Sequence, residues 1–154
     1  MLAVLGRNVR DRELLAVLAD SNVHLDQDLV LVAETAQAYL EKKGEGFSLA
    51  FHDDTFEDGV STAPARDQLI FHAVFLYAEG KDGYSQYRGA IPGGIRFDNT
   101  RAAIEVLGAP SWHRKRDDGS VIAERWDLPE HHIHVTYSRG AEMPTVISLG
   151  TPVA

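Results

Sequence analysis

Three histidines lie close together in the second half of the chain, and histidine is the commonest protein metal ligand. His131, His132 and His134 fall in one short segment. On a strand, His132 and His134 would share a face and could form half of a zinc site. Histidines elsewhere in the chain could complete it: His52, His72 and His113. No acidic residue stands at a tight ligand spacing from them, so we predict no metal and no other cofactor.

Two pairs of carboxylates form a second cluster, at Asp53, Asp54, Glu57 and Asp58. Paired carboxylates can serve acid–base chemistry or bind a divalent cation. The same residues between two strands are also typical of a solvated acidic loop, and we favour that interpretation. We expect these four carboxylates to contact a basic partner.

Nucleophilic chemistry has little support in the sequence. The chain contains no cysteine, which excludes disulfides, thiol nucleophiles and thiolate metal sites. It has no Gly-x-Ser-x-Gly motif, and nothing marks a Ser-His-Asp triad. The absence of cysteine also fits a reducing compartment.

Aromatic residues outside an obvious core are candidates for binding a partner. Tyr84 and Tyr87 lie in a polar loop, and Trp112 follows a predicted helix. Tyr and Trp are favoured at protein interfaces because they provide a large contact area with few rotatable bonds. We expect these three residues, with His132 and His134, to contact the partner, and we expect Trp126 to pack in the core.

Length and charge limit the classes of protein that fit. The 154 residues make one average domain, and 23 acidic against 15 basic residues give a formal charge of −8. An acidic chain of this kind binds nucleic acid phosphates and anionic lipids poorly, but it can bind a basic protein well. No apolar stretch approaches the roughly 18 residues of a membrane-spanning helix, and no signal peptide is evident. We therefore expect a soluble, cytoplasmic protein that binds neither nucleic acid nor membrane.

The first half of the sequence predicts a helix followed by strands. Apolar spacing and a possible Asp11 N-cap predict a helix at about 11–20. The stretch 24–38 is ambiguous, with a strand or irregular structure favoured before Thr35. Residues 38–41 and 47–51 flank a Gly-rich turn and predict a hairpin. Residues 69–77 are apolar on both faces, which predicts a central strand covered on each side.

The second half repeats this order after a polar loop at 80–94. A helix is predicted after a cap at residues 98–100, ending at Gly108 before Pro110. Strands are predicted at about 121–127, 131–137 and 145–149. The basic run 113–116 is followed at once by two aspartates, and we interpret it as a solvated hairpin tip.

The two halves are weakly similar to each other. Val17-Leu18-Ala19 corresponds to Val106-Leu107-Gly108, and the strand 47–51 corresponds to 133–137. We predict one α+β domain over 1–154 with internal repeats at about 11–79 and 95–150. Each repeat would be a helix–antiparallel-sheet module, and the two tandem modules would share one sheet, because either half alone would leave an apolar face exposed.

Several segments resemble a known pattern. Residues 97–101, Val106–Pro110, Trp126-Asp127 and the strand 132–137 resemble the helix–LGxP–sheet module of outer-membrane-assembly lipoproteins and the β-lactamase inhibitor protein, which contains two such modules. Residues 74–89 are more closely similar to a segment of small bacterial immunity proteins of polymorphic or secreted toxin systems. The resemblance covers roughly 14–149. Residues 57–67 depart from it as an insertion, and Asp20 and Ser21 replace the Gly-x-Pro ending in the first half.

The resemblance implies a tandem two-module α+β fold and a protein that is not an enzyme. An immunity protein binds its cognate toxin domain and neutralises it, and no catalytic residues are implied. We therefore expect a toxin-binding immunity protein that acts in interbacterial competition. The alternative is a small metal-binding protein or enzyme that uses the histidine-rich strand 131–134.

Overall fold

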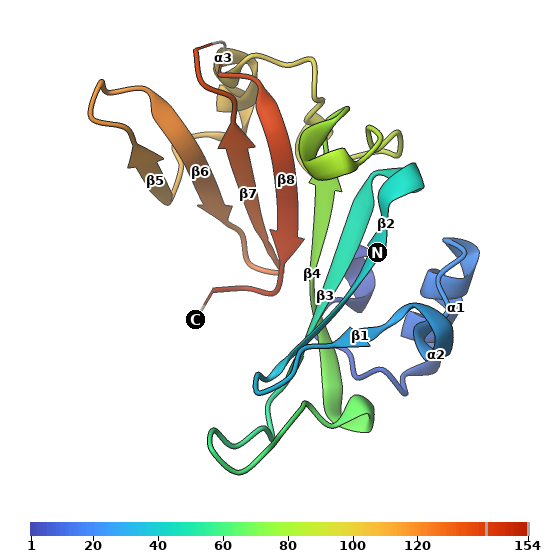
Figure 1. The fold of residues 1–154 in the computed structure, drawn as a ribbon. Helices are drawn as coiled ribbons and strands as arrows, with labels where there is room; N and C mark the ends of the chain where they lie inside the picture. The colour runs from blue at the N-terminus through green and yellow to red at the C-terminus, as the bar shows by residue number, and fades with distance from the viewer. Residues whose placement is uncertain (141, 154) are drawn as a thin grey trace. The chain divides into compact units, whose positions relative to one another are not determined.

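The computed structural model describes residues 1–140 and 142–153. It is an α+β structure with a few short helices and an eight-stranded antiparallel sheet, in which the strand order is β1-β2-β3-β4-β8-β7-β6-β5 (Figure 1). The predicted α+β class is confirmed. The chain divides into two compact units, which we describe separately: the N-terminal unit (Met1–Glu41 and Ser48–Val74) and the C-terminal unit (Lys42–Phe47 and Phe75–Ala154).

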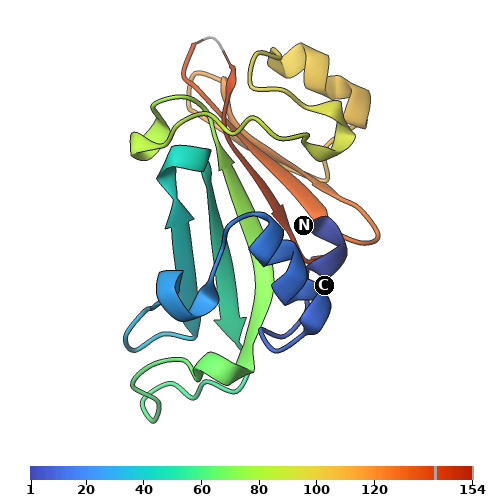
Figure 2. The same cartoon turned by 90° about the vertical axis from the view of Figure 1, so that its right-hand side faces the viewer.

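The N-terminal unit combines two helices with strands. Its elements are α1 (Arg12–Asp20), α2 (Leu25–Asp28), β1 (Val30–Leu31), β2 (Gln37–Lys42), β3 (Phe47–Asp53) and most of β4 (Leu69–Tyr77), with short 3-10 helices at Leu2–Val4 and Arg66–Gln68. Both helices lie on the same face of these strands (Figures 1 and 2). The side chains that fill the core of this unit are Leu14, Leu18, Leu40, Leu49, Phe51, Leu69 and Phe71.

Helix α1 begins where its sequence predicts. The side chain of Asp11 accepts hydrogen bonds from the backbone N–H groups of Glu13 and Leu14, which otherwise have no partner in the first turn. Leu14 and Leu18, one turn apart, are fully buried against the sheet. The helix predicted at about 11–20 is therefore confirmed. The ambiguous stretch after it divides between the short helix α2 and the two-residue strand β1.

Strands β2 and β3 form the predicted hairpin, and Gly46 in its turn has no room for a side chain. Gly46 has φ +79°, and a Cβ there would lie 2.3 Å from the carbonyl oxygen of Ser85. Strand β4 has the predicted bounds and a central place in the sheet. Over the first part of β4 one face is buried, whereas the face that carries Ile70 and His72 is only partly covered there, so the expectation of two covered faces holds in part.

The C-terminal unit contains the remaining strands and one short helix. Its elements are α3 (Arg101–Ile104), β5 (Trp112–Lys115), β6 (Val121–Asp127), β7 (His132–Tyr137) and β8 (Pro144–Gly150), with 3-10 helices at Lys43–Glu45, Lys81–Gly83, Pro92–Gly94 and Glu105–Leu107. Thr100 caps α3 through the backbone N–H of Ala103, and the chain turns away at Gly108 with φ 84°. The predicted helix is confirmed, although its second half is 3-10.

Strand β5 corrects the prediction for the basic run 113–116. Residues Trp112–Lys115 form an edge strand paired with β6, with His113 opposite Glu124 and a bulge between Arg114 and Lys115. The hairpin turn comes later, at 116–120, where the N–H of Arg116 bonds to the carbonyl of Ser120. All four residues of β5 are exposed, so no alternation of apolar and polar residues marks this strand in the sequence.

The core of the C-terminal unit lies under β6, β7 and β8. Its main buried side chains are Ile104, Val121, Trp126, Ile133, Val135, Ile147 and Leu149. Trp126 is 3% exposed, and its indole N–H donates to the carbonyl of Gly108 at 2.9 Å. Its predicted place in the core is confirmed. Among the described residues of the whole chain, no helix has the length and apolar character needed to cross a bilayer.

Candidate functional site

The net charge of the chain resides in one unit. The N-terminal unit holds four arginines, no lysine and twelve acidic residues, a net charge of −8. The C-terminal unit holds eleven basic and eleven acidic residues, a net charge of zero. Any long-range attraction of a basic partner therefore originates in the N-terminal unit.

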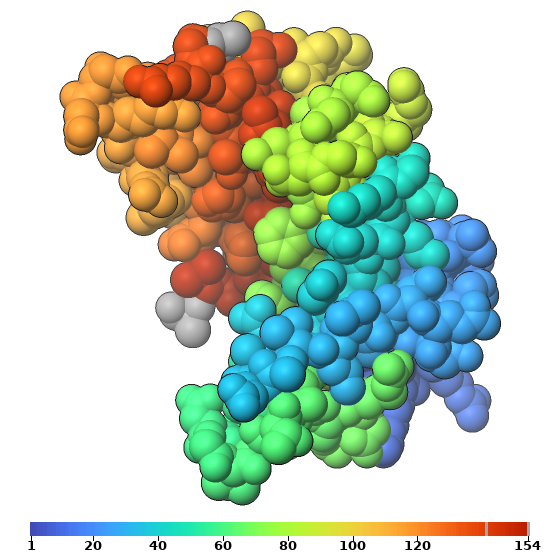
Figure 3. All heavy atoms as spheres, viewed as in Figure 1, coloured from blue at the N-terminus to red at the C-terminus, as the bar shows by residue number. Residues whose placement is uncertain are grey.

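The most prominent acidic feature of the N-terminal unit is the acidic loop, residues 54–64, which follows β3. Asp54, Glu57 and Asp58 are all exposed there, and the Asp54 side chain is 75% exposed. The loop is closed by backbone bonds from Val60 and Ser61 to the carbonyl of Glu57. In Figure 3 the loop, in green, stands out from the rest of this unit. These three predicted contact residues can reach a partner.

Asp53 corrects the prediction, because it is 2% exposed and its carboxylate is used inside the unit. Its oxygens accept hydrogen bonds from the Thr55 hydroxyl at 2.6 Å, the Thr55 N–H at 2.8 Å and the Ala65 N–H at 2.7 Å. Burial alone would raise the pKa of Asp53, but these hydrogen bonds together lower it below the usual 3.8. Asp53 joins the two ends of the acidic loop and has no surface to offer a partner.

The two loop tyrosines also pack inward. Tyr84 is 3% exposed, with its ring stacked on Tyr77 at a centroid distance of 3.7 Å and the Lys43 ammonium 5.5 Å from its ring. Tyr87 is half-buried and meets the Phe47 ring edge-on at 6.3 Å. Tyr84 is thus unavailable to a partner, and Tyr87 offers only part of its ring, because the two rings hold the loop 80–94 in place.

Trp112 is the best exposed aromatic residue among the predicted contacts. It lies on β5 with 39% of its surface exposed, and its ring stacks on His134 of β7 at 5.8 Å. The Arg125 guanidinium lies 5.9 Å from the same ring, within the range of a cation–π contact. Burial, followed by the charges of His132 and Arg125, lowers the pKa of His134 below 6.5. The cluster presents an aromatic surface with the guanidinium of Arg125 beside it.

The His132 side chain contacts other residues of the C-terminal unit. Its Nδ1 lies 2.7 Å from the carbonyl oxygen of Thr151. Its ring also lies over Gly150, where an added Cβ would come within 2.3 Å of it. Residues 1–140 and 142–153 include no group of three or more His, Asp or Glu side chains placed to hold a metal ion. The strand 131–134 therefore does not assemble a ligand set within the described structure.

Sequence reasoning missed an exposed apolar residue inside the acidic loop. Val60 is 74% exposed and lies in the loop two residues after Asp58. The signal in the sequence was a single β-branched residue among charged and turn-forming neighbours. A residue in such a segment is not expected to pack in a core. An exposed apolar side chain in a loop that also carries exposed carboxylates is suited to contact a partner with both basic and apolar groups.

The residues described above define an α+β protein with one strongly acidic unit and one neutral unit. Comparisons with protein-family models, curated proteins and solved structures found no match for this chain.

Proposed function

We propose that this chain is an immunity protein, which binds a cognate bacterial toxin domain and neutralises it by steric occlusion, without catalysis. The observation that carries the proposal is the segregation of charge: the N-terminal unit has a net charge of −8 and the C-terminal unit a net charge of zero. The sequence resemblance to immunity proteins points to the same class.

The physical basis of the proposal is electrostatic steering. Many toxins that attack nucleic acids or nucleotides are basic at their active sites, and an acidic surface is attracted to such a site at a raised association rate. A standard interface buries about 1,600 Å² in total, enough to cover a substrate cleft. The exposed carboxylates Asp54, Glu57 and Asp58 would lie at this interface, with Val60 of the same loop as an apolar contact.

The finer description of the fold belongs to the same proposal. We propose that the two halves are tandem modules, each with a capped helix ahead of antiparallel strands. In support, Asp11 caps α1 and Thr100 caps α3, and each helix packs buried leucine or isoleucine residues into its own unit. We also propose that the protein acts in the cytoplasm, which suits a chain without cysteine.

The first experiment identifies the partner and tests neutralisation together. The full chain serves as bait in a lysate of the source bacterium, and the retained toxin domain is then expressed with and without the chain. We expect growth to be restored only on co-expression. A tightly bound domain whose toxicity persists on co-expression would contradict the proposal.

A second experiment tests which carboxylates attract that toxin domain. We expect the triple variant Asp54→Asn/Glu57→Gln/Asp58→Asn to lower the association rate about three- to tenfold and to weaken its salt dependence. The matched control removes three exposed carboxylates from the neutral unit: Glu105→Gln, Asp117→Asn and Glu130→Gln. Equal effects of the two triple variants would remove the acidic loop from the interface.

A further inference from the structure

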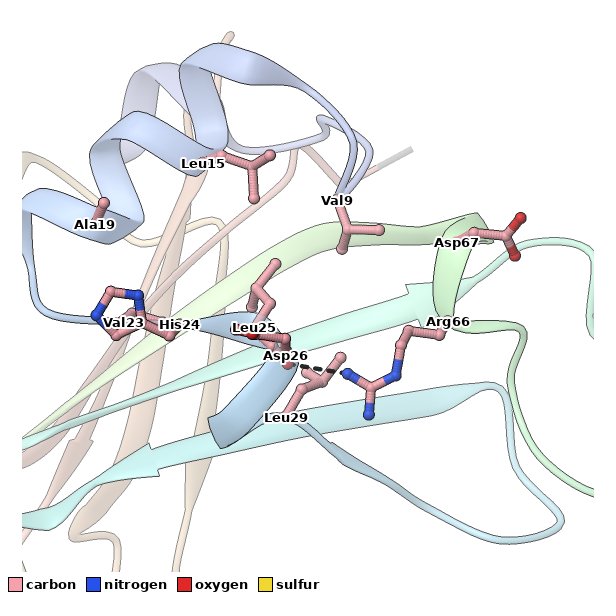
Figure 4. Close-up of a pocket in the computed structure, with 10 residues that line it drawn as sticks. All are labelled: Val9, Leu15, Ala19, Val23, His24, Leu25, Asp26, Leu29, Arg66 and Asp67. Atoms are coloured by element: carbon pink, nitrogen blue, oxygen red, sulfur yellow. Dashed lines mark hydrogen bonds between the residues drawn. The ribbon is translucent and has the colours of Figure 1, made fainter.

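The N-terminal unit contains an open apolar groove between its two helices. The groove has a volume of about 820 Å³, within the roughly 300–1,000 Å³ of typical ligand sites. Its lining residues are Val9, Leu15, Ala19, Val23, His24, Leu25, Asp26, Leu29, Arg66 and Asp67. Figure 4 shows Leu15 of α1 facing Leu25 of α2 across it. None of the residues that the sequence predicts as contacts lines this groove.

The groove exists because α1 has more apolar residues than its core face can use. Leu14 and Leu18 are fully buried, whereas Leu15 is 41% exposed and Ala19 is exposed beside it. Residues one position apart on a helix differ by about 100° in direction, so Leu14 and Leu15 cannot both enter the core. A second apolar stripe therefore remains on α1, open to an occupant.

The charged residues that line the groove are two aspartates, Asp26 and Asp67, and one arginine, Arg66. Arg66 is tied to the backbone, donating from Nη1 to the carbonyl of Leu25 at 2.9 Å. Asp67 forms an ion pair with Arg10. Asp26 is exposed at the groove, and the described residues give its carboxylate no hydrogen-bond or ion-pair partner. The surrounding unit adds a net charge of −8.

We propose that this groove binds an amphipathic, positively charged helix of a protein partner. The apolar face of such a helix would cover Leu15, Ala19 and Leu25, and its lysines and arginines would lie beside Asp26. A second copy of this chain is a poor occupant, because it would bring another unit of charge −8 to the same place. The inference rests on the proposed function, because it takes the helix in the groove to belong to the partner protein.

The test uses synthetic helices, so its result does not depend on the toxin. Three fluorescein-labelled 18-residue peptides are compared by fluorescence anisotropy with the full chain: an amphipathic Leu/Lys helix, the same composition with the leucines scattered around the helix, and an amphipathic Leu/Glu helix. We expect the amphipathic Leu/Lys peptide to bind at least about tenfold more tightly than either control.

Variants then locate the binding site. Leu15→Gln removes apolar surface from an already exposed position, and we expect it to weaken binding about tenfold. Ala19→Arg places a cation inside the groove and should weaken binding further. Its matched control is Ala16→Arg, which adds the same charge at an exposed position on the same helix that does not line the groove.

Three results would overturn the inference. Equal affinity for the amphipathic and scattered Leu/Lys peptides would show attraction by charge alone. Equal losses from Ala19→Arg and Ala16→Arg would place binding outside the groove. A third result would be that no peptide binds, whereas the apolar dye 1-anilinonaphthalene-8-sulfonate binds and loses its binding in Leu15→Gln. This result would assign the groove to a small ligand. If no peptide binds in the groove, the chain can still neutralise a toxin through another surface. If the chain does not neutralise a toxin, the measured peptide binding remains valid.

Discussion

The two units of this protein use their carboxylates in opposite ways. In the C-terminal unit, acidic residues are matched by bases, as in the pairs Arg96–Asp98, Arg101–Glu124 and Arg125–Asp127. In the N-terminal unit, Arg7 pairs with Asp11 and Glu13 and Arg10 pairs with Asp67, but twelve acidic residues stand against only four arginines, so the unit keeps an excess of eight negative charges. The paired charges of the C-terminal unit stabilise that unit. The excess negative charge of the N-terminal unit is available for interaction with a partner.

Glu124 illustrates the structural use of charge. It is 3% exposed and accepts from Arg101 Nη2 at 2.7 Å and from the Tyr137 hydroxyl at 2.9 Å. The hydrogen bond to Glu124 raises the pKa of Arg101, and burial together with the same carboxylate raises the pKa of Tyr137. Because Arg101 comes from α3 and Glu124 from β6, this network holds the helix on the sheet.

The largest contrast between the units should follow from replacing one glutamate in each. We expect Glu124→Gln to lower the free energy of unfolding by about 2 kcal/mol, because it removes the charge of a buried carboxylate that is hydrogen-bonded to the partly exposed Arg101 guanidinium and leaves that guanidinium only the more distant Glu142, at 3.9 Å. We expect Glu57→Gln, in the acidic loop, to change it by no more than about 0.5 kcal/mol. Urea unfolding of both variants measures the two values. Similar losses would mean that the acidic loop is structural too.

Asp53 is the exception in the acidic unit and should behave like Glu124 on a smaller scale. We expect Asp53→Asn to lower the free energy of unfolding by about 1–2 kcal/mol, since the amide nitrogen cannot accept a hydrogen bond. The control is its exposed neighbour, Asp54→Asn. Because the folded pKa of Asp53 is lowered, its contribution is complete above pH 3.8 and is lost as the pH falls through the folded value. A loss from Asp54→Asn equal to that from Asp53→Asn would refute this role.

His134 provides a pH test confined to the C-terminal unit. Its pKa is lowered from 6.5, chiefly by burial, so the unfolded chain takes up a proton at a higher pH than the folded chain does. Stability should therefore be complete above pH 6.5 and decrease modestly as the pH falls below it. We expect the variant His134→Gln to lack this part of the decrease, as measured by urea unfolding between pH 7.5 and 5. Identical profiles would exclude His134 as the cause.

The smallest expected effect is the response of the acidic unit to salt. Its excess carboxylates repel one another, so raising NaCl from about 0.05 to 0.5 M should increase the free energy of unfolding by about 0.5 kcal/mol. The variant Glu57→Gln/Asp58→Asn should gain less, and the variant Glu105→Gln/Asp117→Asn in the neutral unit should gain as much as the wild type. A uniform gain would indicate a general salt effect.

Elements with strong local signals could be predicted from the sequence. The Asp11 cap marks α1, the apolar run marks β4 with its observed bounds, and alternation marks β7. Strand β5 could not be predicted, because all its side chains are exposed and only the pairing with β6 makes it a strand. That pairing is a long-range property which no local pattern contains.

The candidate contact residues show the same difference between local and long-range signals. The exposure of Glu57 and Asp58 follows from a charged, turn-rich segment, as expected. The burial of Asp53 could not be inferred, since it depends on the N–H of Ala65, twelve residues later. The groove did leave a trace, because consecutive Leu14 and Leu15 on one helix require two apolar faces. This doublet would have been the signal for it.

The two edges of the sheet have a consequence for the protein at high concentration. One edge strand, β1, has two residues, and the other, β5, has four exposed residues, of which Arg114 and Lys115 are positively charged. Short and positively charged edges are poor templates for strand addition between identical chains. The two margins of the sheet therefore disfavour aggregation by strand pairing between identical chains.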